Sequence, residues 1–372
     1  MDLEVSGRVP RVGGSFDAVT ILISGELITS VSPLVGPAPS ELLLPGLVDI
    51  HNHGGGGASF TTGSADEIET AARHHHAAGT TTLLGSAVTD SPDRLLAVTS
   101  ALASACDSGL LAGIHVEGPF IAESCRGAHD PALLRLPDVA LTRELIAAAR
   151  GHLRVVTLAP ELPGAGEVAA EFDAAGVIAA AGHTAAPAAD LRAFLSRSDG
   201  HRGLVTHLFN GMPPTHHRDP GPVLGALGAA AAGSAFVELI ADGVHLDDET
   251  VRAVIDLVPD AFVLVTDAMA AAGMPDGDYR LGPLDVEVRA GVARLAGGGS
   301  IAGGTSRLLD QVRRHASAGR DLGLLVEAAS ARPASVVGLD GVGRLAPGNR
   351  ADLVVTDETL RPLRVMRSGA WL

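Results

Sequence analysis

The stretch LPGLVDIHNHGGGG, residues 44–57, joins a largely apolar run to two histidines and then to four glycines. Successive side chains on a strand point to opposite faces, so His51 and His53 are expected to point the same way. Two imidazoles side by side favour a metal ion, but two ligands do not complete a metal site. The remaining ligands must therefore come from other parts of the chain.

Seven further short runs are similar, because they are apolar throughout and end in polar or charged residues. With the first, they cover residues 47–53, 80–87, 111–118, 154–161, 177–184, 203–210, 235–242 and 262–269. Such runs are typical of a parallel sheet covered on both faces. The spacers between them, such as residues 91–106 and 246–257, have the length and composition of helices. Eight such units predict an α/β fold, a (β/α)8 TIM barrel with its active site at the carboxyl ends of the strands.

The two ends of the chain do not fit the barrel. Residues 1–44 and 342–372 both read as short strands joined by turns. We expect them to pair into one small β-domain, a β-sandwich built from both termini, which leaves residues 45–341 for the barrel. A further strand-rich segment, residues 278–298, is predicted to form a hairpin insertion near the active site.

Composition excludes several classes of function. The net charge of the 372-residue chain is −16, which argues against a nucleic-acid partner or an anionic membrane surface. The chain contains no lysine, which excludes Schiff-base chemistry, a P-loop lysine and a metal centre bridged by a carbamylated lysine. No apolar run approaches the roughly 20 residues needed to cross a membrane, and the first residues lack the apolar core of a secretory signal. With only two cysteines, Cys106 and Cys125, we expect a cytoplasmic protein without a disulfide framework.

Histidines and carboxylates recur where the predicted strands end. They are His51, His53, His115, Glu117, His183, His207 and Asp267, and Asn210 and His245 lie in the following loops. Two imidazoles and one carboxylate with an open position make a catalytic zinc-type site, whose metal lowers the pKa of a bound water and polarises a carbonyl group. A free carboxylate at the eighth strand, Asp267, would take the proton from that water and pass it to a leaving amine. This chemistry is metal-assisted hydrolysis of a C–N bond.

Eight motifs occur in order along nearly the whole chain. They are PGLVDIHNHGGGG (45–57), HVEGPF (115–120), RGAHDP (126–131), AGHT (181–184), THLFNGMPP (206–214), DGVHL (242–246), VTDAMAAAG (265–273) and SIAGGT (300–305). Together they resemble the amidohydrolase superfamily and, within it, the N-acetylglucosamine-6-phosphate deacetylase family. The closing GRLAPGNRADLVV (343–355) resembles the return of the superfamily's chain to its small β-domain.

By this resemblance, Glu117, His183 and His207 hold the principal divalent metal, with zinc preferred and iron, manganese or cobalt as alternatives. His51 and His53 match the position of a second metal, so one or two ions per subunit are expected. Asp267 is implied to be the general base and then the general acid. The residues implied to bind the substrate, a small phosphorylated amino sugar, are Ala128, His129, Asn210, Gly211, Arg218, His245, Ala302, Gly303 and Gly304.

The resemblance also implies roles for these residues. His129 would reach the acetyl carbonyl or the sugar, and Asn210 and Gly211 would offer groups to the phosphate. Arg218 would pair with the phosphate from the neighbouring subunit, which implies a homodimer. His245 would contact a sugar hydroxyl, and residues 302–304 would form a loop that closes over the substrate. The expected reaction converts N-acetylglucosamine 6-phosphate to glucosamine 6-phosphate and acetate.

Alternatives remain open at this point. The same barrel would suit a deacetylase of N-acetylgalactosamine 6-phosphate or of another N-acyl substrate. A structural or interaction module would be expected to lose the metal ligands, whereas this chain keeps every candidate. His115 is either barrel filling, support for the ligands, or a ligand itself. The triplet His74, His75 and His76 is expected on a helix surface, because consecutive helical residues diverge by about 100°.

Overall fold

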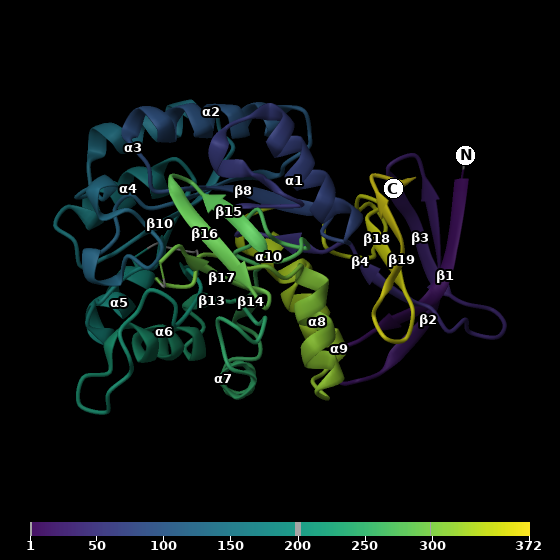
Figure 1. Ribbon diagram of the computed structural model, residues 1–372. Coiled ribbons are helices and arrows are strands. Elements are labelled where there is room, and N and C mark those ends of the chain that lie inside the picture. Colours follow the sequence, from purple (N-terminus) through teal and green to yellow (C-terminus); the bar gives the residue numbers. More distant parts are fainter. Residues whose placement is uncertain (1, 198–201, 298) are drawn as a thin grey trace. The chain divides into compact units, whose positions relative to one another are not determined.

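Figure 1 shows a computed structural model of the chain, which describes residues 2–197, 202–297 and 299–372. Met1 and Gly298, the outer ends of two segments predicted above, lie outside the described residues. The chain folds into two compact units. Residues 1–50, 73–83 and 307–372 form the first unit, and residues 51–72 and 84–306 form the second.

Eight parallel strands form one sheet in the order β5–β8–β9–β10–β11–β12–β13–β14, which confirms the predicted barrel. The strands are β5 (Val48–Asp49), β8 (Thr82–Val88), β9 (Gly113–Glu117), β10 (Leu153–Leu158), β11 (Ile178–Ala181), β12 (Gly203–Val205), β13 (Ala235–Leu239) and β14 (Phe262–Leu264). Nearly every strand residue is buried, which explains why the runs are apolar throughout. Just past the strand ends the backbone N–H of Asp267 donates to the carbonyl of His51 at 2.9 Å, so the barrel nearly closes.

Helices connect successive strands, and α2 to α7 surround the strands of the barrel (Figure 1). The helices between strands are α1 (Ala65–Ala77), α2 (Pro92–Asp107), α3 (Val139–Ala148), α4 (Ala165–Ala174), α5 (Ala188–Leu195), α6 (Gly221–Ala231) and α7 (Asp248–Leu257). After the eighth strand come α8 (Leu308–Ser317), α9 (Leu322–Ala328) and α10 (Ala331–Val336), and short 3-10 turns are η1 (Phe60–Thr62), η2 (Glu123–Cys125) and η3 (Pro131–Leu133). Asp138 and Asp247 cap α3 and α7 by accepting from backbone N–H groups. Within the described ranges, no helix has both the length and the apolar character that a membrane crossing requires.

The two ends of the chain pair as expected, in one seven-stranded sheet of the first unit with the order β20–β19–β18–β4–β1–β2–β3. Its strands are β1 (Asp2–Pro10), β2 (Phe16–Ser24), β3 (Leu27–Pro33), β4 (Leu42–Pro45), β18 (Leu353–Thr356), β19 (Pro362–Arg367) and β20 (Ala370–Trp371). The link is β4, which pairs with β1 on one side and with β18 on the other. Ile21, Leu43, Leu353 and Met366 are buried together in its core.

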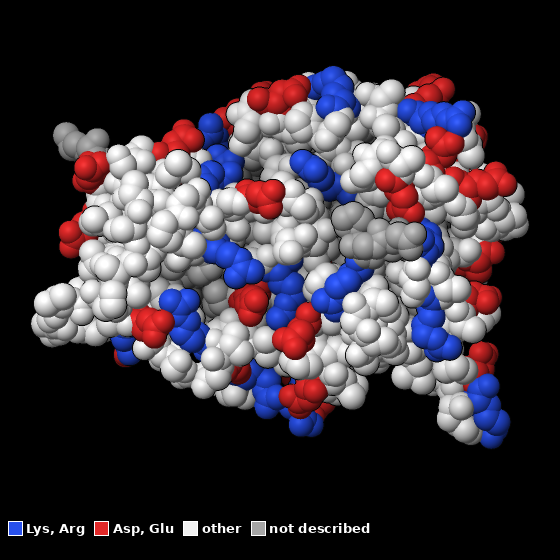
Figure 2. Space-filling model, turned by 180° about the vertical axis from the view of Figure 1, so that it is seen from behind, with Lys and Arg blue, Asp and Glu red and all other residues white. Residues whose placement is uncertain are grey.

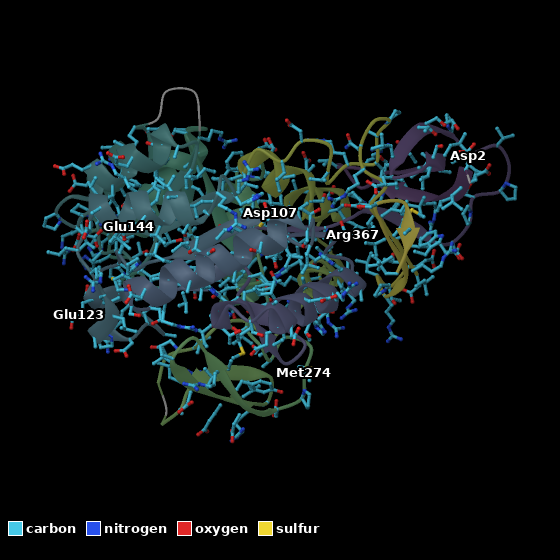
Figure 3. The ribbon with its side chains drawn as sticks, turned by 90° about the horizontal axis from the view of Figure 1, so that it is seen from above. Asp2, Asp107, Glu123, Glu144, Met274 and Arg367 are labelled. Carbon is cyan, nitrogen blue, oxygen red and sulfur yellow. The ribbon has the colours of Figure 1, made fainter. Side chains whose placement is uncertain are left out.

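The predicted insertion after the eighth strand is a three-stranded antiparallel sheet made of β15 (Gly277–Leu281), β16 (Leu284–Arg289) and β17 (Val292–Leu295). Figure 3 labels Met274, just before the chain enters this sheet. The buried side chains of the sheet, including Leu281 and Val286, pack with Met269 and Ala302. The insertion is therefore attached to the loops that follow the eighth strand. A second small pairing joins β6 (Gly54–Gly55) to β7 (Ala58–Ser59).

Charged side chains are interspersed on the face seen in Figure 2. Among the described residues that this view shows, blue side chains are separated by red and white ones. A polyanion needs a continuous basic surface, and this face does not offer one.

The histidine triplet on α1 differs from the expectation, because His75 and His76 are buried and only His74 is half-buried. The helix turns these rings inward within the first unit. Burial, and after it the charges of Arg367 and His75, lowers the pKa of His76 from 6.5 to about 3. The ring is therefore neutral in the folded chain at pH 5, where an unfolded chain would bind a proton.

This shift predicts an acid-sensitive contribution to stability from His76. Since the folded pKa is depressed, the unfolded state binds more protons below pH 6.5, and stability falls as the pH drops from 6.5 towards 3. The loss at pH 5 amounts to about 2 kcal/mol. His76→Gln should therefore lose less stability than the wild type between pH 7.5 and pH 5 in urea denaturation. His217→Gln, an exposed control, should lose as much as the wild type. Equal losses in all three proteins would contradict this assignment.

Candidate active site

The predicted metal ligands lie at or just beyond the carboxyl ends of the barrel strands. Glu117 is the last residue of β9, and His183 and His207 stand two residues beyond β11 and β12. His183, His207 and Asp267 have positive φ angles of 47°, 26° and 47°. Each such residue costs on the order of 1–3 kcal/mol, and strain of this kind clusters at functional sites. The chain therefore accepts local strain after three strands at the positions that carry the candidate site.

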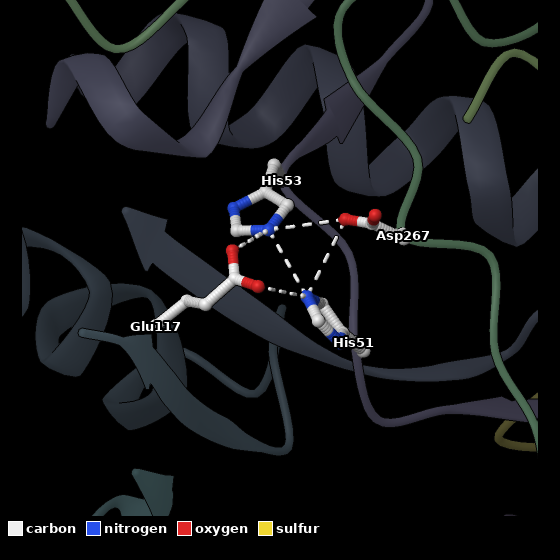
Figure 4. Close-up of side chains that lie close together, drawn as sticks. All are labelled: His51, His53, Glu117 and Asp267. Carbon is white, nitrogen blue, oxygen red and sulfur yellow. Dashed lines mark hydrogen bonds and ion pairs between the residues drawn. The ribbon is translucent and has the colours of Figure 1, made fainter. Parts of the chain in front are cut away.

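The first group of ligand atoms comes from His51, His53, Glu117 and Asp267 (Figure 4), whose atoms lie within 4.8 Å of one another. The Nε2 atoms of His51 and His53 are 3.1 Å apart, which confirms that both rings point the same way. His53 Nε2 lies 3.2 Å from Glu117 Oε2 and 3.3 Å from Asp267 Oδ1. His51 Nε2 lies 3.4 Å from the same oxygen of Asp267.

The second group shares Glu117 with the first. Its Oε1 lies 3.0 Å from His183 Nε2 and 2.9 Å from His207 Nε2, and those two nitrogens are 3.1 Å apart. His129 Nε2 lies 3.6 Å from the other oxygen of Glu117. One carboxylate thus stands between two pairs of imidazoles, which is the arrangement that a bridging ligand requires.

Hydrogen bonds on the far side of the rings fix which nitrogen faces the centre. His183 Nδ1 donates to the carbonyl of Cys125 at 2.8 Å, and His53 Nδ1 donates to the carbonyl of Ser86 at 3.2 Å. Since a carbonyl oxygen only accepts, both rings present Nε2 without a proton towards the ligand groups when neutral. Such outer hydrogen bonds are what orient metal-binding histidines.

The electrostatics of the cluster favour a cation. Burial opposes protonation of His51 and His53, but the carboxylates of Asp267 and Glu117 outweigh it, so the pKa of His53 rises to about 9 and that of His51 lies well above 6.5. Burial would raise the pKa of Glu117, yet hydrogen bonds from the surrounding histidines hold it well below its ordinary value. The pKa of Asp267 is lowered in the same way. Both carboxylates therefore stay ionised, and the chemistry of this donor set fits a divalent metal, whose charge would replace the protons.

Two further histidines are neutral at physiological pH. Burial lowers the pKa of His129 to about 4, and burial also lowers the pKa of His115 well below its ordinary value. His115 is held by the hydroxyls of Ser86 and Thr157 at 2.9 Å and 2.8 Å, and its ring meets that of His51 edge-on. It therefore packs beside His51 rather than facing the open cavity.

A cavity of about 220 Å³ opens above the ligands. Most of the predicted substrate-binding residues line it, namely Ala128, His129, Asn210, Gly211, His245 and Gly303. Gly211 lies close to a ligand, since a Cβ there would stand 2.6 Å from His183 Nδ1. Gly304 is equally constrained, because a Cβ would stand 2.4 Å from the carbonyl of Thr266. Small residues at these positions let the backbone approach the site closely.

The structure does not bring every predicted residue into this cavity. Ala302 is fully buried in the core of the insertion, and Gly304 donates its N–H to the carbonyl of Asp267. Arg218 is exposed on the loop before α6, and its guanidinium lies 2.8 Å from His217 Nε2. It is not among the residues that line the cavity.

Sequence reasoning missed several residues of the site. Glu238, on β13, is buried, and its Oε2 accepts from His51 Nδ1 at 3.1 Å. Asp242 holds His245 through a 2.9 Å hydrogen bond to Nδ1. A carboxylate between the apolar residues 235–237 and 239–241 was the available signal for Glu238. Val88 and Leu281 also line the cavity, and no motif marked them. Ser300 and Ile301 line it too, and they open the motif of residues 300–305 without having been assigned a role.

Known proteins resemble this chain over its length. The model of the amidohydrolase family matches residues 42–372. A structure of an N-acetyl-D-glucosamine-6-phosphate deacetylase mutant from Mycobacterium smegmatis, in complex with N-acetyl-D-glucosamine-6-phosphate, is 39% identical with a TM-score of 0.93, and the match covers 100% of this chain and 99% of that one. The N-acetylgalactosamine-6-phosphate deacetylase of Escherichia coli O157:H7 is 35% identical over 96% of this chain and 95% of its own length.

The human N-acetylglucosamine-6-phosphate deacetylase is 38% identical over 69% of this chain, and the matched part spans 64% of the human protein. The family match, the agreement in fold and the ligand-rich strand ends are mutually consistent. The chain belongs to the amidohydrolase family and, within it, to the group that includes the N-acetylglucosamine-6-phosphate deacetylases.

Proposed function

We propose that the protein hydrolyses the N-acetyl group of N-acetylglucosamine 6-phosphate and releases glucosamine 6-phosphate and acetate. The observation that carries this proposal is the convergence of Glu117, His183 and His207 beneath a cavity that Asp267 also lines. Metal-assisted hydrolysis of an amide requires a set of metal ligands and, beside it, a carboxylate that can transfer protons. The 39% identity to the mycobacterial deacetylase supports the choice of substrate.

We propose that Glu117, His183 and His207 hold the principal divalent ion and that His51 and His53 hold a second, with Glu117 shared. Imidazole and carboxylate ligands suit zinc, which is our preferred ion, and also iron, manganese or cobalt. A bound divalent ion would polarise the acetyl carbonyl and lower the pKa of a water molecule. The amount of metal per chain in the purified protein decides between one ion and two.

The remaining roles belong to side chains around the cavity. Asp267 would accept the proton of the attacking water and deliver it to the departing amine. His129, which lines the cavity, would donate a hydrogen bond to the oxygen of the acetyl group as negative charge develops there. His245, held by Asp242, would bind a sugar hydroxyl, and the segment Asn210–Gly211 would face the phosphate. Ala128 and the loop of residues 302–304, whose Gly303 lines the cavity, would enclose the sugar.

The direct test is acetate release from N-acetylglucosamine 6-phosphate and from N-acetylglucosamine, with metal-loaded and chelator-treated protein and with metal counted in the same samples. We expect fast turnover of the phosphorylated sugar by the metal-loaded protein and little by the stripped protein. Metal-loaded protein that releases no acetate from either sugar would show the substrate assignment to be wrong.

A second candidate substrate is N-acetylgalactosamine 6-phosphate. The relative that favours it is the Escherichia coli deacetylase of that sugar, which matches 96% of this chain. The two sugars differ only in the configuration of one hydroxyl. Comparing kcat/KM for both in the same assay would decide which epimer the site prefers.

Arg218 is proposed to bind the substrate phosphate in the active site of the neighbouring subunit of a homodimer. Its exposure and its position outside the cavity lining of its own chain support this reading. Arg218→Gln should lower kcat/KM for N-acetylglucosamine 6-phosphate by on the order of 10²-fold, because a charge-assisted contact to the phosphate is lost. The low activity on unphosphorylated N-acetylglucosamine should stay nearly unchanged.

Mixed dimers test whether Arg218 acts across the interface. Asp267→Asn protein keeps Arg218, and Arg218→Gln protein keeps Asp267. If the arginine comes from the partner, dimers reassembled from the two variants contain one complete site and recover activity. If each arginine serves its own chain, the mixture stays as inactive as the separate variants, and the proposal fails.

We further propose that the protein is cytoplasmic and that residues 45–341 are its metal-dependent amidohydrolase domain, flanked by the small β-domain of residues 1–44 and 342–372. Both cysteines are free, which suits a reducing compartment.

A further inference from the structure

Glu238 is a buried carboxylate in an apolar strand. Glu238 is 1% exposed. Its neighbours along β13, Val237 and Leu239, are apolar and fully buried. Placing a carboxylate in such surroundings is costly unless hydrogen bonds compensate. An alanine or leucine would fill this strand position without that cost, so the contacts of Glu238 need an explanation.

One oxygen of Glu238 contacts a residue of each ligand group. Oε2 accepts from His51 Nδ1 at 3.1 Å and from the backbone N–H of His207 at 3.1 Å. The rings of His51 and His207 stack with their centroids 5.4 Å apart. Glu238 therefore links His51 of the first group to His207 of the second group, through contacts away from the ligand atoms of both rings.

The backbone contact matters because the ring of His207 is held differently from the others. Among the described residues, no hydrogen-bond partner is found for His207 Nδ1, whereas His183 Nδ1 and His53 Nδ1 both bond to carbonyls. His207 also has a strained φ of 26°. Its backbone hydrogen bond to Glu238 is thus a restraint on where its ring lies.

We propose that Glu238 is a positioning residue that sets the geometry and occupancy of the metal centre, acting on the His51 site through Nδ1 and on the His207 site through the backbone. The inference rests on the proposed function only in taking these histidines as metal ligands. A carboxylate behind a ligating imidazole fixes its tautomer, so His51 presents Nε2 to the metal, and raises its basicity. His51 is the ligand shown in Figure 4 whose far nitrogen meets a carboxylate.

The test uses zinc titrations of chelator-stripped protein, with bound metal counted by mass spectrometry and melting midpoints of the stripped proteins as a check of folding. Glu238→Gln keeps the size and one acceptor but lacks the charge. We expect it to weaken binding of the ion at the His51 site by about 10–100-fold. Glu238→Ala, which removes both hydrogen bonds, should weaken both sites.

A matched control is Glu161→Gln. Glu161 accepts from the hydroxyl of Thr184 and the backbone of Ala185, so it holds residues next to His183 without contacting a ligand ring. The Glu161→Gln variant should bind zinc with the affinity of the wild type. If it weakens zinc binding as much as Glu238→Gln, the effect reflects general disturbance of the barrel, and the proposal is wrong.

The deciding experiment combines Glu238→Gln with His51→Ala. If Glu238 acts through His51, the change at residue 238 should have little further effect on zinc affinity once His51 is gone. Equal weakening with and without His51, or wild-type zinc binding by Glu238→Gln, overturns the proposal. If the wild type binds a single ion, Glu238→Ala should weaken its binding through the lost hydrogen bond to His207, and wild-type zinc binding by that variant would overturn the proposal.

The outcome is separable from that of the proposed function. Zinc binding that depends on Glu238 in a protein that releases no acetate would overturn the deacetylase assignment and leave the role of Glu238 standing. If the wild type deacetylates the sugar and Glu238→Gln binds zinc as the wild type does, the deacetylase assignment stands and the proposed role of Glu238 is wrong.

Discussion

Asp267→Asn is expected to fold and to bind metal but to lower kcat by about 10²–10⁴-fold, because it removes the group proposed to carry the proton. The carboxylate lines the cavity, and its Oδ1 lies 3.3 Å from His53 Nε2 and 3.4 Å from His51 Nε2. An asparagine of the same size keeps an oxygen for those contacts but cannot accept a proton from water. Rapid-quench measurement of acetate formation at saturating substrate gives the chemical rate directly.

The control for Asp267→Asn is Asp107→Asn. Asp107 lies at the end of α2, is labelled in Figure 3, and pairs with Arg150 and His152 at the surface. It should keep wild-type turnover, since an exposed ion pair contributes little. A wild-type rate for Asp267→Asn with normal metal content would remove Asp267 from proton transfer. A loss of metal in Asp267→Asn would instead identify Asp267 as a metal ligand.

The barrel and most of the site were predictable because their signals are local. Runs that are apolar throughout and end in histidine or carboxylate mark strands buried on both faces, with polar groups at one end of the sheet. Glu117, His183, His207 and Asp267 each lie near the end of such a run, and the structure brings them together. The spacing in the first motif likewise placed the rings of His51 and His53 on one face.

The remaining features depend on contacts between distant parts of the chain. Glu238 lies inside a strand, and only the folded barrel shows that its oxygen meets His51, 187 residues away in sequence. The burial of His76 is similar, since α1 presents this ring to residues near the C-terminal end, such as Arg367. Neither relation leaves a periodic pattern in the local sequence. The left-handed conformations of His183 and Asp267 also leave no local signal, although histidine and aspartate adopt positive φ more often than most non-glycine residues.

Glu117→Ala is expected to lose metal from both groups and to lower kcat/KM by at least about 10³-fold, which corresponds to roughly 4 kcal/mol of transition-state stabilisation. Glu117 contacts both ligand groups: Oε1 lies 3.0 Å and 2.9 Å from the Nε2 atoms of His183 and His207, and Oε2 lies 3.2 Å from His53 Nε2. Without it, the buried imidazoles of His183 and His207 would face each other with no carboxylate between them. Metal content after dialysis against a fixed free zinc concentration, measured beside activity, tests both parts of the expectation.

His129→Asn is the informative comparison for Glu117→Ala. The Nε2 atom of His129 is near enough to Glu117 and His183 for the three to form a metal-binding group. Its distance of 3.6 Å from Glu117 Oε2 is nevertheless longer than those of His183 and His207 from Oε1, and it lines the cavity. We therefore expect His129→Asn to keep its metal and to lose activity, as a residue that contacts the substrate would. If it loses metal as Glu117→Ala does, His129 is a ligand, and its proposed contact with the acetyl oxygen is wrong.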